Sequence, residues 1–181
     1  MHLVGIGSYG ASLVASLWLD KDRRQQLESQ SSVTWMASET SAANLLTNRL
    51  LQKALTSGAE LTTDIGQGPF HPPAGAHIVV GLGGNGAIRL VEAASQGRLE
   101  GCTIHGLLPF SYDVYRERAV QAAAALKLWE VAKSDRHLLL VDAAEYTHTQ
   151  ESAAVVIKRI QGLLQDSVCR LLPGMTSQHL A

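Results

Sequence analysis

Short apolar segments alternate with longer segments of helical periodicity along this chain. The apolar segments predict five strands, at His2–Ile6, Val33–Ala37, His77–Gly81, Thr103–Leu108 and Leu138–Asp142. Several are continuous apolar runs, which are typical of parallel strands covered on both faces. The helical patterns between them cover Ala11–Gln30, Ala42–Thr56, Ala87–Ser95, Asp113–Lys133 and Gln150–Val168. This alternation predicts an α/β fold, with a doubly wound, mainly parallel sheet and helices on both faces.

Local signals add detail to this pattern. Thr147 and Gln150 have the spacing of a capping box before the last helix. Gly66–Gly75 is too rich in glycine and proline for a helix, so we expect an exposed loop there. We expect the tryptophans at positions 18, 35 and 129 to anchor the core. No repeat or linker interrupts the chain, so residues 1–181 are predicted to form a single domain.

Composition excludes several classes of protein. Apolar residues make up 46% of the 181 residues, and 15 basic residues oppose 16 acidic ones. This balance argues against a disordered chain and against a basic nucleic-acid binder. Two cysteines, Cys102 and Cys169, indicate neither a disulfide framework nor a thiolate metal site. The seven histidines form no metal-binding pattern on a helix, so no metal site is predicted from them.

The segment Leu3–Leu19 is apolar enough to resemble a signal peptide or a short membrane span. Only Met1 and His2 precede it, so it lacks the positive region of a signal, and its glycines and serines do not suit a membrane helix. We interpret it as a strand, a glycine turn and a helix. The expectation is a cytoplasmic protein without membrane insertion.

The first candidate site is a glycine turn after the first strand. Gly5-Ile6-Gly7-Ser8-Tyr9-Gly10 has the G-x-G-x-x-G pattern between a strand and a helix. Backbone N–H groups of such a turn approach a phosphate at the positive end of the helix. We therefore expect Gly7, Ser8, Tyr9 and Gly10 to bind phosphate; a tight turn without a ligand is the alternative. Glu39, near the end of the second strand, is an acidic residue that would hold a ribose in a dinucleotide site.

A second glycine turn follows the third predicted strand. Gly81-Leu82-Gly83-Gly84-Asn85-Gly86 also leads into a helix, and Gly83, Gly84, Asn85 and Gly86 are its candidate phosphate-binding residues. Two such turns at neighbouring strand ends favour a diphosphate or triphosphate ligand. Neither contains the Gly-Lys-Ser/Thr sequence of a P-loop, so a P-loop kinase or ATPase is not indicated.

A further segment, Thr103–Ala119 (TIHGLLPFSYDVYRERA), combines a strand, a Pro-Phe turn and the start of a helix. It looks like the same elements of the bacterial division GTPase FtsZ and its tubulin relatives. The other similarities are weaker and cover nearly the whole chain. Val4–Gly7 and Val80–Gly86 (VGLGGNG) are similar to phosphate loops of the family, and Leu61–Gly68 (LTTDIGQG) is similar to its third loop. Leu139–Val141 resembles the next strand, Val155–Leu164 resembles the central helix, and Pro173-Gly174 resembles the start of the catalytic loop. The resemblance implies the nucleotide-binding half of an FtsZ-like protein, with Asp113 and Arg116 near the ribose.

The chain departs from the family at residues that bind the nucleotide. The family's GGGTGTG loop is shortened to Gly83-Gly84-Asn85-Gly86 before Ala87, which leaves fewer backbone donors and no threonine hydroxyl. Ala11 stands where the family has an asparagine after the first glycines. The guanine-contacting Asn-Asp pair of the family aligns roughly with Ala153 and Ala154, which removes the acceptor that selects guanine.

The chain departs further from the family at the residues that carry out catalysis. The resemblance places the family's acidic, water-positioning loop at 174–181 (GMTSQHLA), which contains no Asp or Glu, and the family's second domain has no counterpart here. We therefore expect no catalytic residue, and neither efficient hydrolysis nor autonomous polymerisation.

Three functions remain open. The first is a divergent domain that binds GTP or GDP, with or without Mg²⁺. Such a domain would associate with itself or with an FtsZ-like filament. The second is an FtsZ-like interaction or regulatory module of a division or cytoskeletal system that binds no nucleotide. The third is an NAD(P)-binding protein, which rests on the first glycine turn and Glu39.

Overall fold

A computed structural model describes residues 1–58, 60–66, 68–82, 84–108, 116–131, 136–140 and 150–172. They form a six-stranded sheet in the order β3-β2-β1-β4-β5-β6, and every neighbouring pair is parallel. The strands are β1 (His2–Ile6), β2 (Thr34–Glu39), β3 (Leu61–Ile65), β4 (His77–Gly81), β5 (Thr103–Leu108) and β6 (Arg136–Leu140). The predicted doubly wound α/β class is confirmed.

The predicted strands agree best with the structure at the centre of the sheet. β1, β4 and β5 have the predicted bounds, whereas β2 continues two residues further, through Ser38 to Glu39. β6 begins earlier than predicted, and residues 141 and 142 lie outside the described part of the chain. β3 was not predicted, because only Leu61 of its five residues is buried, so an edge strand of this kind shows no apolar run. The described residues of Gly66–Gly75 form neither helix nor strand, as expected.

Seven helices lie in the described part of the chain: α1 (Gly7–Leu19), α2 (Lys21–Gln30), α3 (Ala42–Thr47), α4 (Arg49–Ser57), α5 (Asn85–Ser95), α6 (Arg116–Val131) and α7 (Ala153–Leu171). Two predicted helices are each divided in two, at Asp20 and at Asn48. Both residues have extended backbone and accept a hydrogen bond from the backbone N–H three residues later, at 3.1 Å for Asp20 and 3.0 Å for Asn48. Asp and Asn favour such caps, which explains the breaks. The predicted capping box is not the start of α7: its N-cap is Ser152, and Thr147 lies outside the described residues.

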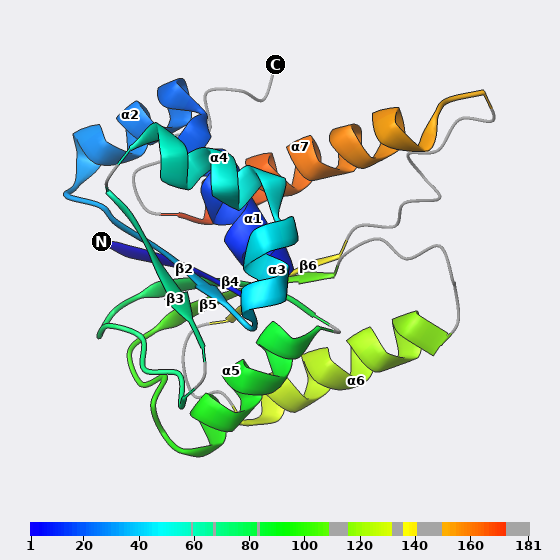
Figure 1. The fold of residues 1–181 in the computed structure, drawn as a ribbon. Helices are drawn as coiled ribbons and strands as arrows, with labels where there is room; N and C mark the ends of the chain where they lie inside the picture. The colour runs from blue at the N-terminus through cyan, green and yellow to red at the C-terminus, as the bar shows by residue number, and fades with distance from the viewer. Residues whose placement is uncertain are drawn as a thin grey trace.

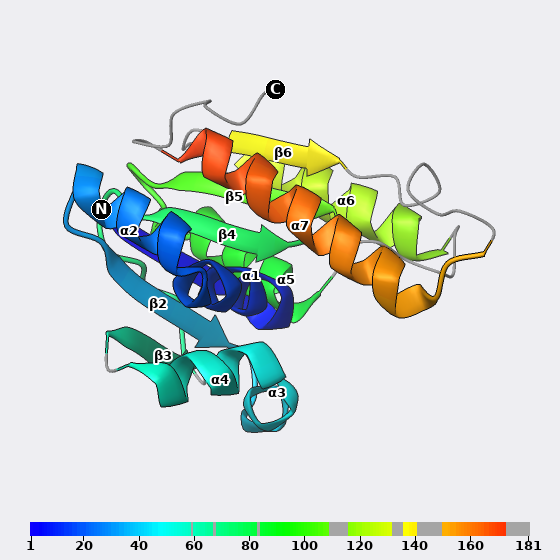
Figure 2. The same cartoon turned by 90° about the horizontal axis from the view of Figure 1, so that it is seen from above.

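The sheet is the middle of three layers (Figures 1 and 2). Helices α1, α2, α4 and α7 lie on one side, and α5 and α6 lie on the other. Each side has its own buried apolar cluster, the first around Leu13, Leu17 and Leu164 and the second around Ile78 and Leu90. No helix in the described residues is long and apolar enough to cross a bilayer, and Leu3–Leu19 forms a strand, a turn and a helix as interpreted.

The tryptophan prediction is correct for two of the three residues. Trp18 and Trp35 are buried and meet edge to face, with ring centroids 5.7 Å apart. Trp129 was predicted to be in the core and is not, because it lies on the outer side of α6 with 53% of its surface exposed. The Ala-rich sequence of α6 gives almost no apolar periodicity from which its buried side could be identified.

Helix α1 lies unusually close to the strands beneath it. A Cβ atom on Gly5 would overlap the carbonyl oxygen of Gly10, and one on Gly10 would overlap the carbonyl oxygen of Val79. A Cβ on Gly81 would lie 2.6 Å from the Cβ of Tyr9. Glycine at these positions therefore lets α1 pack backbone to backbone against β1 and β4.

This packing predicts opposite effects of one substitution at two helical glycines. Gly10→Ala adds a methyl group where there is no space, so we expect it to lower the free energy of unfolding by about 1–3 kcal/mol. Gly162→Ala in α7 meets nothing within 4 Å, so helix propensity predicts a gain of up to about 1 kcal/mol. Urea denaturation of the two variants measures both effects. A change of the same sign in both would contradict the close approach of α1.

Tyr9 generates a second prediction. Burial raises the pKa of its phenol to about 12, and the unfolded chain has the ordinary value of about 10. The neutral phenol therefore favours the folded state, and this contribution is present below pH 10 and is lost as the pH rises towards 12. We expect the free energy of unfolding to fall less steeply over this interval in Tyr9→Phe than in the unaltered protein. Equal slopes would show that burial does not raise the pKa of this phenol in the folded protein.

Candidate functional site

The strand order reverses between β1 and β4, at the carboxyl edge of the sheet. The connections turn in opposite directions on the two sides of this pair, and ligands of doubly wound sheets bind at such a point. Gly7 follows β1 and begins α1, while Gly84 and Asn85 follow β4 and begin α5. Both predicted glycine turns therefore flank this point.

The two turns touch each other through backbone. A Cβ atom on Gly86 would lie 2.7 Å from the carbonyl oxygen of Ile6 and 2.9 Å from the Cα of Gly7. Gly7 has a φ of +74°, a left-handed conformation that L side chains rarely adopt. The structure thus brings the turn at Gly7 and the turn at Gly86 together, and only glycine fits at either position.

Neither helix that begins here is capped by its own side chains. The N-cap residues Ile6 and Gly84 make no side-chain hydrogen bond, in contrast to the capped starts of α2, α3 and α4. The first N–H groups of a helix have no acceptor within the helix, and its dipole places partial positive charge there. Ser8 and Asn85, in these first turns, are exposed. The two helix starts together can therefore donate several hydrogen bonds to one anion.

The residues after Ser8 also have a packing role. Gly10 is buried against Val79, one turn into α1, and its contact with phosphate stays a prediction. The side chain of Tyr9 packs over Gly81, and its contact with phosphate likewise stays a prediction. Burial accounts for the raised pKa of that phenol.

Glu39 lies beside the first turn, at the end of β2. Its carboxylate oxygen Oε1 accepts hydrogen bonds from the hydroxyl of Ser8 at 3.2 Å and from the N–H of Thr40 at 2.8 Å. The side chain is fully buried, and Oε2 has no partner among the described residues. The carboxylate therefore brings negative charge to the start of α1. Its position was predicted, but its burial was not, since the strand was expected to end at Ala37.

Two further residues that sequence reasoning missed support this edge. The amide of Asn48 donates to the hydroxyl of Ser12 at 2.8 Å and to the carbonyl of Ser8 at 3.4 Å, so it holds the first turn of α1. Arg89, in α5, donates to the hydroxyl of Ser38 at 3.2 Å and so connects α5 to β2. No local motif marks either residue, because each acts on an element distant in sequence.

The remaining predicted site residues cannot be placed in this geometry. Gly83 and Asp113 lie outside the described residues. Arg116 is the first residue of α6. Their contacts with phosphate and ribose remain predictions. The loop at 174–181, predicted to lack catalytic acids, also lies outside the described part of the chain.

Comparison with known proteins identifies the fold. A scan of family models finds no match, and a search of curated sequences finds none either. Solved structures do match. CetZ from Methanosaeta thermophila strain DSM 6194 matches with a TM-score of 0.61 at 15% identity over 99% of this chain. An FtsZ dimer from M. jannaschii matches with a TM-score of 0.61 at 14% identity over 99% of this chain. CetZ1 from Haloferax volcanii, a GDP-bound monomer, matches with a TM-score of 0.57 at 17% identity over 91% of this chain.

The matches cover only part of the other proteins. The chain spans 56–57% of the length of these structures. At such low identity, the similarity concerns the arrangement of the backbone and not the chemistry of the site. The described strand order and the length of the match agree with the resemblance seen in the sequence, and the chain therefore has an FtsZ/tubulin-like fold.

Proposed function

We propose that this chain binds a guanine nucleotide, GTP or GDP, with its phosphates at the adjoining starts of α1 and α5. The observation that carries the proposal is the contact between Gly7 and Gly86, which unites two uncapped helix starts at the point where the strand order reverses. Diphosphates and triphosphates suit such a site because they carry several negative oxygens that one helix start cannot satisfy alone.

The choice of guanine rests on similarity. One of the matching structures, Haloferax volcanii CetZ1, is a GDP-bound monomer with the same fold. We propose that Gly83 completes the second turn, that Asp113 and Arg116 lie near the ribose, and that Mg²⁺ accompanies the phosphates. The absence of Asp and Glu from 174–181 supports slow hydrolysis by this chain alone.

One observation favours a second candidate, an interaction module that binds no nucleotide. The buried carboxylate of Glu39 is bonded to Ser8, so like charge lies close to the proposed phosphate position. Repulsion of this kind would weaken nucleotide binding. The same residue gives little support to a dinucleotide site, because a ribose could reach a fully buried carboxylate only after Ser8 and Thr40 had moved.

Thermal unfolding with GTP, GDP, ATP and NAD separates these functions. A ligand at one hundred times its Kd stabilises the folded state by about 2.7 kcal/mol. We expect GTP and GDP to raise the Tm more than ATP and NAD, and we expect no appreciable release of phosphate from GTP. A shift with NAD alone would favour the dinucleotide alternative, and no shift with any of the four would favour the interaction module.

A charge placed at the second turn tests where the phosphates bind. Asn85 is exposed in the first turn of α5, so Asn85→Asp adds an acidic group that suits the helix dipole and leaves the fold intact. The same charge would repel phosphate, and we expect Kd for GDP to rise by about tenfold or more in isothermal titration calorimetry. Asn85→Gln, which adds no charge, is the matched control. Unchanged affinity in Asn85→Asp would place the phosphates elsewhere.

A further inference from the structure

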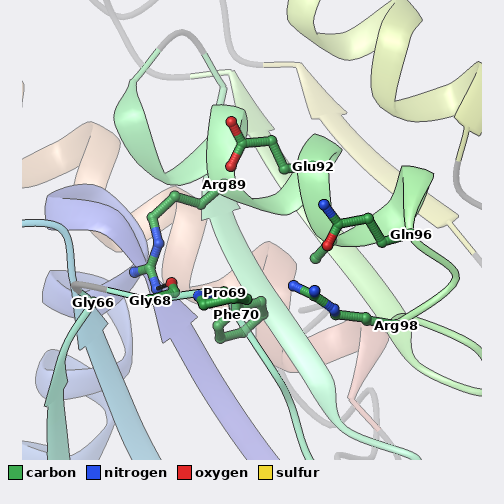
Figure 3. Close-up of a pocket in the computed structure, with 9 residues that line it drawn as sticks. Gly66, Gly68, Pro69, Phe70, Arg89, Glu92, Gln96 and Arg98 are labelled. Carbon is green, nitrogen blue, oxygen red and sulfur yellow. Dashed lines mark hydrogen bonds between the residues drawn. The ribbon is translucent and has the colours of Figure 1, made fainter.

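A pocket lies between α5 and the segment that links β3 to β4 (Figure 3). It has a volume of about 400 Å³ and is formed by one side of α5, the residues that follow this helix, and that segment. Its lining residues are Gly66, Gly68, Pro69, Phe70, Arg89, Glu92, Ala93, Gln96 and Arg98. This volume is at the lower end of the range of pockets that hold small molecules, about 300–1,000 Å³.

Two guanidinium groups converge in this pocket. Figure 3 shows Arg89 and Arg98 pointing towards Phe70 from opposite sides, while the carboxylate of Glu92 points away from the ring. The pocket is therefore cationic around an apolar floor, since Phe70 is buried and lies 5.8 Å from the guanidinium carbon of Arg89.

Arg89 is held in place by the protein and keeps unused donors. Its Nη1 donates to the hydroxyl of Ser38 at 3.2 Å, and its Nη2 donates to the carbonyl of Gly68 at 3.2 Å. A Cβ atom on Gly66 would overlap the guanidinium, so glycine at this position makes room for it. Because a guanidinium has five N–H donors, these contacts leave three for a ligand.

Arg98 has no such contacts. Its side chain is half-buried, and it makes no hydrogen bond or ion pair with any described residue. Its guanidinium donors are therefore available to an anion in the pocket. Arg98 and the fixed guanidinium of Arg89 are thus the two groups that an anion would meet.

We propose that this pocket binds a small organic anion, in which a carboxylate or phosphate group meets Arg89 and Arg98 and an aromatic or aliphatic body lies against Phe70 and Pro69. The exposed amide of Gln96 is available to a polar substituent of the same ligand. The lining residues of this pocket differ from those proposed to bind the nucleotide, because it uses neither helix start.

Titration with four small compounds, followed by amide chemical shifts in the ¹⁵N-labelled full chain, tests the proposal. Phenyl phosphate and benzoate supply an anion with a ring, inorganic phosphate supplies the anion alone, and benzyl alcohol supplies the ring without charge. We expect phenyl phosphate or benzoate to shift the amide signals of Gly68, Phe70 and residues 89–98, and the stronger of the two distinguishes phosphate from carboxylate. We expect inorganic phosphate and benzyl alcohol to bind at least about tenfold more weakly.

Substitution of Arg98 completes the test. Arg98→Gln is expected to weaken binding of the preferred anion by about tenfold or more, because it removes a charge-assisted hydrogen bond. Arg49→Gln, which removes an exposed charge on α4, is the matched control and should not alter it. Equal binding of benzyl alcohol, equal losses in the two variants, or no shift at Gly68, Phe70 and 89–98 with either ring anion would overturn the proposal. Since the shifts are mapped on the unaltered protein, the test stands even if Arg98→Gln is less stable.

Discussion

The contact between the backbones of Gly7 and Gly86 determines what this fold can do. A side chain at either position would separate the ends of β1 and β4, and α1 and α5 would then begin too far apart to share a ligand. The same constraint continues into the sheet, where Gly5 and Gly10 let α1 lie directly on β1 and β4. The close packing of α1 on the sheet and the contact of its start with the start of α5 are therefore two results of one property, the absence of side chains.

Two electrostatic contributions oppose each other at this edge of the sheet. Two uncapped helix starts favour an anion, whereas the buried carboxylate of Glu39 disfavours one. The hydrogen bonds from Ser8 and Thr40 disperse part of that negative charge. Whether the site holds a nucleotide depends on the balance between these terms, and for this reason the fold alone does not establish the function.

Sequence patterns predicted the parts of the structure that depend on local chemistry. Continuous apolar runs gave β1, β4 and β5, and the two glycine patterns located the turns that the structure brings together. Prediction failed where tertiary context decides. The edge strand Leu61–Ile65 is largely exposed, and Trp129 lies on an Ala-rich helix with no distinct apolar side. The burial of Glu39 and the reach of Arg89 to Ser38 join elements distant in sequence, so no local motif reveals them.

Amide chemical-shift mapping of the ¹⁵N-labelled chain with GDP tests the central claim most directly. The account predicts that saturating GDP shifts the backbone N–H signals of Gly7, Ser8, Asn85 and Gly86 together and with one Kd, because both helix starts would contact the same phosphates. Shifts confined to one turn, or no shift at either, would contradict it.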